Sequence, residues 1–313
     1  MSRTLTVHPV PGLGAEDVVV GRSGRDEGAV FTGTSDGSIF RVSHDGATVD
    51  RVARTQGRPL GLEIDVDGRL LVCDAHRGLL RVDTRDGAVE AVTGDVDGRP
   101  MRFCNNAAIS SEGAIWFSDS STEFGIVDWK ADFLRNTRTG RLLRRDTDGT
   151  VTVVLDGLAF ANGVALSRAE DFVAVAETGA RTVVRHWLTG PNAGTRDLLC
   201  SDLPGYPDNI ARGSDGLIWV TIASPRDAVV ERLQTGPMLL RRLATRLPPR
   251  LQPAPQRTVR VQAYDDQGQL IHDVDVDLEA QRTPYHMVTG VREHEGRVWL
   301  GSLHEAAIAV VDL

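Results

Sequence analysis

A short segment recurs six times along the chain and constrains the fold more than any other feature. Each copy places an acidic or polar residue and a glycine before an alternating apolar run, as in S-E-G-A-I-W-F-S-D from Ser111. Acidic–Gly pairs between such runs are typical of tight hairpin turns, because glycine tolerates a positive φ. The six markers of the repeat are Gly28, Gly68, Gly113, Asp171, Gly216 and Gly296, with Asp171 in place of Gly in one degenerate copy.

The spacing of these markers indicates the architecture. Apart from two longer intervals, neighbouring copies lie about 40–45 residues apart, which is the length of one four-stranded propeller blade. A β-sandwich would also contain many short strands, but it would not repeat one marker six times at this period. The sequence therefore predicts an all-β, six-bladed β-propeller that occupies residues 1–313 as a single domain.

The two longer intervals predict insertions at residues 122–139 and 224–256. In the second, we expect Ser224 to cap a helix whose first position is Pro225. Apolar residues then keep helical spacing: Val229, Val230, Leu233, Leu239, Leu240, Leu243 and Leu247. We expect residues 224–256 to form a helical lid over the central site, with these apolar faces shaping a substrate pocket. The alternative is a pair of helices that only pack against the propeller.

Charge and cysteine content exclude several classes of protein. The chain has 43 Asp and Glu against 35 Lys and Arg, a net charge of -8, and no basic stripe, which disfavours a nucleic-acid partner. Its three cysteines lack C-x-x-C spacing, which disfavours a disulfide framework or a zinc cluster. We see neither an apolar signal segment at the start nor an apolar run of about 18 residues. We therefore expect a cytoplasmic protein without a membrane partner.

Polar residues occur at one repeated phase, near the start of the innermost strand of each blade. Counting back from the markers gives Glu16, Asn105, Asn162 and Asp208, with Leu60 and Val288 completing the ring. Equivalent positions in a propeller face the central channel, so these side chains should converge. Buried carboxylates without a cation are costly, and hard oxygen ligands favour Ca²⁺, with Mn²⁺, Mg²⁺ or Zn²⁺ as alternatives.

The neighbouring Asn106 and Asn209 could add further oxygens. The competing interpretation is that each of these side chains only satisfies backbone groups at its own turn.

Two histidines are candidates for proton transfer. The second strand of each blade returns to the end where the innermost strand begins, which places His76 and His304 near the predicted metal. A histidine beside metal-activated water can shuttle protons. His286, just before the sixth inner strand, lies at the same end. A histidine on a solvent-exposed hairpin is the alternative for each of them.

Four motifs resemble one superfamily of enzymes. They are G-A-E-D-V-V-V around Glu16, F-C-N-N around Asn105, F-A-N-G around Asn162 and Y-P-D-N-I around Asp208. In this order they resemble the calcium-dependent six-bladed propellers of the gluconolactonase (regucalcin) and paraoxonase superfamily, from about Gly14 to the C-terminus. S-D-S-S from Ser118, S-P-R-D from Ser224 and the terminal R-E-H-E-G-R-V-W-L-G-S are most similar to the strictosidine synthase-like branch, including its arylesterase-like members.

This resemblance implies that Glu16, Asn105, Asn162 and Asp208 hold a catalytic metal that polarises a lactone or ester carbonyl. Asn209 then matches a further paraoxonase-type ligand, and His76 matches a paraoxonase histidine more loosely. Strictosidine synthase itself uses a glutamate four residues before its E-H-x-G motif. Here that motif begins at Glu293, and the earlier position is Thr289.

The predicted function is metal-dependent hydrolysis of an apolar lactone or small ester, in which Asp208, with His76 or His304, activates water. Two alternatives stay open. One is a Pictet–Spengler lyase or cyclase, which Thr289 disfavours. The other is a non-catalytic propeller that binds a metal for stability.

Overall fold

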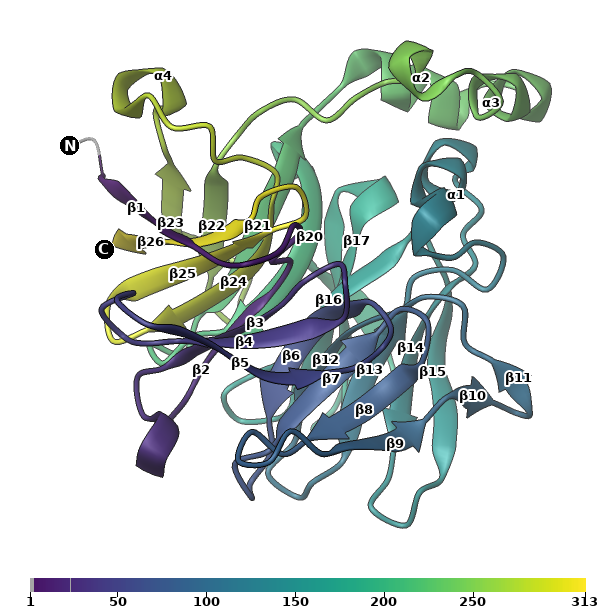
Figure 1. Cartoon of the computed structure of the whole chain (residues 1–313). Helices are drawn as coiled ribbons and strands as arrows, with labels where there is room; N and C mark the ends of the chain where they lie inside the picture. Colours follow the sequence, from purple (N-terminus) through teal and green to yellow (C-terminus); the bar gives the residue numbers. More distant parts are fainter. Residues whose placement is uncertain (1–2, 23) are drawn as a thin grey trace.

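The computed structural model describes residues 3–22 and 24–313, and it confirms the predicted all-β propeller of six blades (Figure 1). Each blade is a four-stranded antiparallel sheet. From the axis outward, the first blade contains β2 (Val18–Val20), β3 (Val30–Gly33), β4 (Ser38–Val42) and β5 (Val49–Arg54). The second contains β6 (Pro59–Ile64), β7 (Leu70–Asp74), β8 (Gly78–Val82) and β9 (Val89–Thr93). The third contains β12 (Cys104–Ile109), β13 (Ile115–Asp119), β14 (Gly140–Arg145) and β15 (Val151–Leu158).

The remaining blades follow the same order. The fourth contains β16 (Ala161–Leu166), β17 (Phe172–Glu177), β18 (Thr182–Trp187) and β19 (Arg196–Cys200). The fifth contains β20 (Gly205–Arg212), β21 (Ile218–Pro225), β22 (Arg260–Tyr264) and β23 (Leu270–Asp275). The sixth contains β24 (Val288–His294), β25 (Arg297–Ser302), β26 (Ala307–Asp312) and, as its outermost strand, β1 (Leu5–Pro9). A small hairpin, β10 (Asp95–Val96) with β11 (Arg99–Pro100), projects after the second blade.

The two ends of the chain close the ring. Strand β1 pairs antiparallel with β26, from Leu5 opposite Val311 to Pro9 opposite Ala307. The sixth blade therefore contains both the first and the last strand of the chain, which lie side by side in Figure 1. This closure ties the blades into a ring that cannot open without breaking a sheet.

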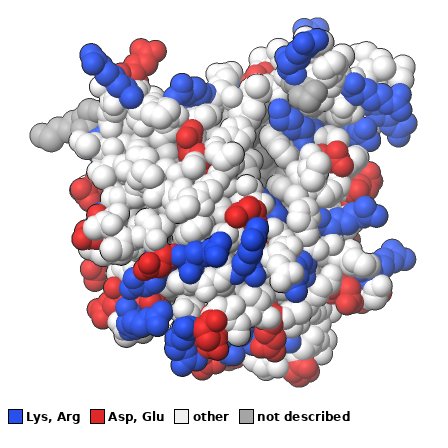
Figure 2. Space-filling model, in the orientation of Figure 1, with Lys and Arg blue, Asp and Glu red and all other residues white. Residues whose placement is uncertain are grey.

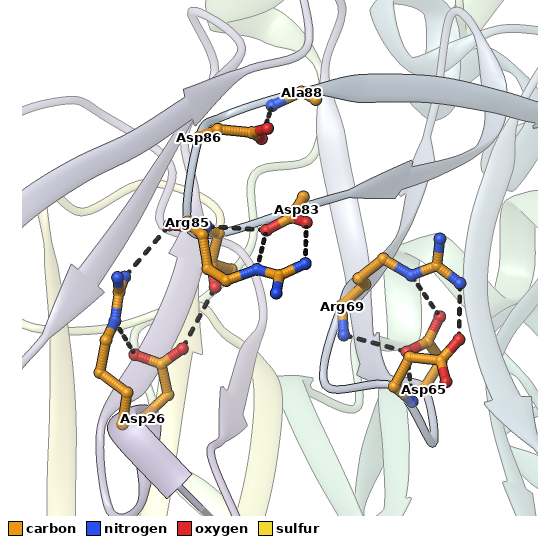
Figure 3. Close-up of polar contacts among 10 residues, drawn as sticks. Asp26, Asp65, Arg69, Asp83, Arg85, Asp86 and Ala88 are labelled. Carbon is orange, nitrogen blue, oxygen red and sulfur yellow. Dashed lines mark hydrogen bonds and ion pairs between the residues drawn. The ribbon is translucent and has the colours of Figure 1, made fainter.

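All six repeat markers lie where the sequence places them, in the turn between the first and second strands of a blade. Aspartates stabilise these and other turns by accepting hydrogen bonds from the turn backbone. The Asp65 carboxylate accepts from the N–H groups of Asp67 and Arg69, and Asp83 accepts from the N–H and guanidinium of Arg85 (Figure 3). The acidic repeat residues thus serve the turns, which explains their abundance without invoking a site.

The apolar core is divided among the interfaces between neighbouring blades. Each interface contains its own cluster of buried side chains, such as the cluster around Phe31 and Leu70 between the first two blades. A seventh cluster lies elsewhere, beneath the helical insertions, and contains Phe103, Phe133 and Phe160. Stability therefore rests on the contacts between blades, whereas the seventh cluster shapes one end of the central channel.

Both predicted insertions contain helices, and they lie together over one end of the channel (Figure 1). The first forms η2 (Ile126–Asp128) and α1 (Trp129–Arg135), and the second forms α2 (Ala228–Thr235), α3 (Met238–Ala244) and η4 (Pro249–Leu251). Short helices elsewhere are η1 (Gly24–Asp26), η3 (Thr178–Ala180) and α4 (Leu278–Gln281).

The predicted helix cap is wrong. Ser224 and Pro225 end strand β21, and the N-cap of α2 is Asp227, whose carboxylate accepts hydrogen bonds from the N–H groups of Val229 and Val230. Ser224 instead accepts a bond from the Gln256 N–H, which joins the two ends of the insertion. Among the described residues, no helix is long and apolar enough to cross a membrane.

Candidate functional site

Irregular pairing at the start of the inner strands positions the candidate site. In five blades the register between the inner and second strands shifts at this point, for example between Cys104 and Ala107 and between Ala161 and Val164. Two residues lie within each shift, and a bulge of this kind re-aims side chains. The first of the two faces the channel mouth: Leu60, Asn105, Asn162, Asp208 and Thr289.

The structure brings together the four side chains that repeat phase selected. Glu16, Asn105, Asn162 and Asp208, here named the oxygen ring, line the floor of a cavity of about 80 Å³ at the end of the channel beneath the helices. We call this the cavity end. Leu60 completes the ring as expected. The prediction for Val288 is wrong, because Val288 is buried in the interface between the fifth and sixth blades and Thr289 lines the cavity instead.

Three buried amide oxygens at this site have no hydrogen-bond partner within residues 3–22 and 24–313: Oδ1 of Asn105, Asn162 and Asn209. The amide nitrogens of these residues are engaged. Asn105 Nδ2 donates to Ser120 Oγ at 2.9 Å, Asn162 Nδ2 to Thr178 Oγ1 at 3.2 Å, and Asn209 Nδ2 lies 3.4 Å from both carboxylate oxygens of Glu16. The first two bonds fix which atom of the amide remains free. Buried acceptors left without a donor are rare, so three at one site call for a positive partner.

The two carboxylates of the ring add to the need for a positively charged partner. Burial raises the pKa of Glu16 well above its usual range, and the nearby charges of Asp208 and Asp17 raise it further. Burial and the charge of Asp17 raise the pKa of Asp208 to about 7, although a hydrogen bond from Asn162 opposes the shift. Among the described residues no three His, Cys, Asp or Glu side chains group to hold a metal. A cation here would therefore depend on asparagine oxygens as well as on the two carboxylates.

A second layer of small and polar residues supports the ring. Asp17 Oδ2 accepts a bond from the Leu62 N–H at 2.8 Å and lies 3.4 Å from Asn106 Nδ2. Asn106 Oδ1 accepts from the Val164 N–H at 2.9 Å, so Asn106 links inner strands and its oxygen is already used. Glycines fill the rest of the layer. A Cβ at Gly163 would lie 1.9 Å from the Ile210 nitrogen, so no side chain fits there.

Aromatic side chains form the walls of the cavity, and sequence reasoning missed all of them. Phe133 of α1 packs edge-to-face against Tyr206, with ring centroids 5.0 Å apart, and against Phe160 at 6.4 Å; Phe103 packs against Phe160 at 5.4 Å. Phe160 also has a φ of 62°, which is uncommon for a bulky residue and directs the chain into the bulge. Two sequence signals pointed to them: the length of the insertion at residues 122–139, which contains Phe133, and an aromatic residue two positions before Asn105, Asn162 and Asp208.

The lid prediction holds for one face of α2 and is wrong for α3. Val230 is 5% exposed and lines the cavity, whereas its neighbour Val229 is 61% exposed. Leu239, Leu240 and Leu243 are more than half exposed and do not line the cavity. These apolar side chains lie among arginines of the same insertion, in the region of Figure 2 where Lys and Arg gather at the upper right.

The predicted histidines lie outside the cavity. His76 is exposed, and its backbone N–H donates to the Asp74 carboxylate at 3.0 Å. His304 is also exposed, and its ring lies 5.6 Å from that of His286, which pairs with Glu305 at 2.7 Å. Partial burial and the His286 imidazole lower the pKa of His304. Neither His76 nor His304 lines the cavity, so their predicted role in proton transfer gains no geometric support.

Thr289 occupies the position where strictosidine synthase was expected to place a glutamate. It is buried, lines the cavity, and donates from Oγ1 to the backbone oxygen of Glu16 at 2.8 Å. Glu293 lies four residues further along β24, at the opposite end of the channel. No carboxylic acid therefore stands at position 289.

Solved structures define the class of fold to which this architecture belongs. A gluconolactonase from Xanthomonas campestris superposes with a TM-score of 0.71 at 18% identity, covering 99% of this chain and 90% of that one. A calcium-binding protein, regucalcin, from Agrobacterium tumefaciens gives a TM-score of 0.66 at 14% identity, covering 99% and 93%. The chain thus has the six-bladed propeller fold of gluconolactonases and regucalcin.

Sequence relatives identify the family within this class. The family model described as Strictosidine synthase matches residues 105–191. Protein strictosidine synthase-like 10 of Arabidopsis thaliana is 36% identical over 82% of this chain and 70% of its own length. The adipocyte plasma membrane-associated protein of Rattus norvegicus is 31% identical over 91% of this chain and 80% of its own length. The chain belongs to the strictosidine synthase-like family, as its motifs predicted.

Proposed function

We propose that this protein is a metal-dependent hydrolase of a lactone or small ester with apolar substituents, in the manner of an arylesterase. The observation that carries the proposal is the set of three unpartnered amide oxygens beside two carboxylates, the buried one of Glu16 and the half-buried one of Asp208. Such a set suits a hard cation, because amide and carboxylate oxygens are the ligands that Ca²⁺ prefers. Ca²⁺ is the proposed ion, and Mn²⁺, Mg²⁺ or Zn²⁺ are alternatives that the same test compares.

The proposed ligands are Glu16, Asn105, Asn162 and Asp208, with Asn209 as a fifth. When bound, the ion would act as a Lewis acid on the substrate carbonyl. Amide oxygens fit this role because the bonds from Asn105 and Asn162 to Ser120 and Thr178 already orient them before a ligand enters. No cysteine lines the cavity, which favours hard ions over thiophilic ones.

Asp208 is the proposed general base. Without a cation, burial raises the pKa of its carboxyl group to about 7. A bound cation would lower that pKa and keep Asp208 ionised at neutral pH, which is the form that can accept a proton from water. The carboxylate takes a proton from water as the water oxygen bonds to the carbonyl carbon. The carbon–oxygen bond of the ester then breaks, and Asp208 returns the proton to the leaving oxygen, which releases an alcohol and a carboxylic acid and restores the carboxylate. His76 and His304 lie outside the cavity, so in this proposal Asp208 acts without them.

The aromatic walls predict the substrate class. Three aromatic side chains line the cavity together with the oxygen ring: Phe103, Phe133 and Phe160. Val230 of α2 also lines it. An apolar acyl or alkyl group would be buried against these side chains, gaining about 25 cal/mol per Å² of apolar surface. Small aryl esters and substituted lactones fit a cavity of about 80 Å³ better than long or charged substrates.

The test is an assay on a panel of aryl esters and lactones, with wild-type protein and Asp208→Ala. We expect EDTA to suppress hydrolysis and Ca²⁺ to restore it. Asp208→Ala should lower kcat/KM by roughly 100-fold or more, which corresponds to about 2.7 kcal/mol of transition-state stabilisation. His304→Ala is the matched control and should retain activity.

The same assay separates the two alternatives. An amine and an aldehyde that condense without metal and regardless of EDTA would support the Pictet–Spengler reading. Absence of turnover across the panel, with a divalent ion demonstrably bound, would favour a metal-stabilised binding propeller. Either outcome would contradict the hydrolase.

A further inference from the structure

The opposite end of the channel, where the inner strands finish, contains four arginines. Arg22 follows β2, Arg168 follows β16, Arg212 ends β20, and Arg292 lies near the end of β24. These four side chains line a cavity of about 350 Å³, together with residues of the turns at Gly213 and His294. We call this the arginine end. Such a gathering is unexpected in a chain whose net charge is -8.

The four guanidinium groups outnumber the two carboxylates beside them, those of Glu63 and Glu293. Glu63, which lines a smaller adjoining cavity, lies 3.2 Å from Arg292. Glu293 lines the larger cavity, but its carboxylate already accepts hydrogen bonds from Ser214 Oγ and from the N–H groups of Asp215 and Gly296. Among the described residues, Arg168 and Arg212 form no ion pair, and the bond that Arg212 makes is from Nη1 to the Ser167 backbone oxygen at 2.9 Å.

The arginines also repel one another. The Glu63 carboxylate by itself would raise the pKa of Arg22. Partial burial and the guanidinium groups of Arg292 and Arg212 act in the opposite direction, and together they hold the pKa of Arg22 below its ordinary value. Arg292 is only 6% exposed, and its Nε has no hydrogen-bond partner in the part of the chain that the structure describes. A buried guanidinium with an unsatisfied N–H is costly, and an anion that enters the cavity would relieve the repulsion around it.

The four arginine side chains differ in exposure, which indicates that they lie at different depths of the cavity. Arg22 and Arg168 are exposed at the rim, Arg212 is half-buried, and Arg292 is buried at the base. The Arg168 side chain packs against Gly216: a Cβ added at Gly216 would lie 3.3 Å from Cδ of Arg168. The guanidinium fork pairs with phosphate through two parallel hydrogen bonds, and forks from separate strands could surround one such group.

We propose that the arginine end is a binding site for a phosphate-type oxyanion, free or carried by a small metabolite. This site is separate from the proposed hydrolytic site, since the layer that contains Asp17 and Asn106 lies between them. The cavity of about 350 Å³ has room for more than a bare phosphate ion. Bound anion would hold the ends of four inner strands together, so it would also stabilise the propeller.

The experiment is isothermal titration of the full chain with inorganic phosphate at constant ionic strength, balanced with sodium chloride. We expect Arg212→Gln to weaken phosphate binding by about tenfold or more, because charge-assisted hydrogen bonds are lost. Arg246→Gln removes an exposed charge from the helical insertion and should leave the affinity unchanged. Glu63→Gln should change it in the opposite direction, tightening binding, because it removes the negative charge nearest to Arg292.

Several results would overturn the proposal. These are phosphate binding no tighter than chloride binding, equal losses in Arg212→Gln and Arg246→Gln, or tight binding of citrate with none of phosphate. If Arg212→Gln fails to fold, Arg168→Gln provides the same comparison from an exposed position. Hydrolysis of esters should be unchanged in Arg168→Gln, so failure of this site and failure of the proposed hydrolase are distinguishable.

Discussion

The two ends of the central channel are built from the same six inner strands but have opposite chemistry. At the cavity end the strands begin. Bulged pairs there present Asp208 and amide oxygens without donors, and the segment before β2 adds the Glu16 carboxylate. At the arginine end the strands finish, and four arginines line a cavity together with one carboxylate, that of Glu293. The comparison shows that the propeller repeat determines where side chains lie at each end of the channel. The residue type at each of those positions then determines whether that end attracts cations or anions.

The cavity end is also covered, whereas the arginine end is open. Both helical insertions follow second strands that return to the cavity end, β13 and β21. They add Phe133 and Val230 to the walls there. The turns at the arginine end stay short, so its cavity is lined by polar turn residues. We therefore expect the covered end to select apolar substrates and the open end to bind small hydrophilic anions.

The largest effect on stability should come from the layer that separates the two ends. Gly163→Ala would place a Cβ 1.9 Å from the Ile210 nitrogen and 2.5 Å from the Asn209 carbonyl carbon, so inner strands must move apart. We expect a loss of about 1–3 kcal/mol in the free energy of unfolding, measured by urea denaturation.

Gly94→Ala is the control for this change. The nearest atom to its added Cβ is the Arg77 backbone oxygen at 3.5 Å, an ordinary contact. The free energy of unfolding should stay within about 0.5 kcal/mol of wild type. Equal stability of the Gly163 and Gly94 variants would mean that the layer between the ends is not tightly packed.

A smaller effect should distinguish covered from exposed residues of α2. Val230→Ala removes two methyl groups from the cavity wall, so kcat/KM for larger apolar esters should fall about three- to tenfold relative to acetate esters. Val229→Ala makes the same chemical change on the exposed face and should leave the substrate profile unchanged. Identical profiles for both variants would show that α2 does not shape the pocket.

Repeat phase predicted the fold and all four residues of the oxygen ring, because equivalent positions of the blades face the same end of the channel. It failed at Val288 because the sixth blade has a two-residue turn at Glu295 and Gly296, which shifts the count by one and brings Thr289 to the mouth. Helical spacing found α2 and α3, but periodicity cannot tell whether anything covers an apolar face. Leu239 and Leu240 are therefore exposed where a pocket was expected.

Other features depend on contacts that no local pattern contains. The packing of Phe133 against Phe160 joins residues from different blades, and the arginine end joins residues that follow four separate strands. The cytoplasmic location stays a prediction. So do the absence of a nucleic-acid or membrane partner and the extent of the single domain.

The central claim is that the oxygen ring at the cavity end binds a divalent cation. Crystals of chelator-treated protein soaked in Mn²⁺, with Asn162→Ala as the matched variant, test it most directly through anomalous scattering. We predict one peak about 2.1–2.6 Å from Oδ1 of Asn105 and Asn162 and from the Asp208 carboxylate, and a weaker peak or none in the variant. Saturating Mn²⁺ with no peak at the ring, or an equal peak in both proteins, would contradict the account.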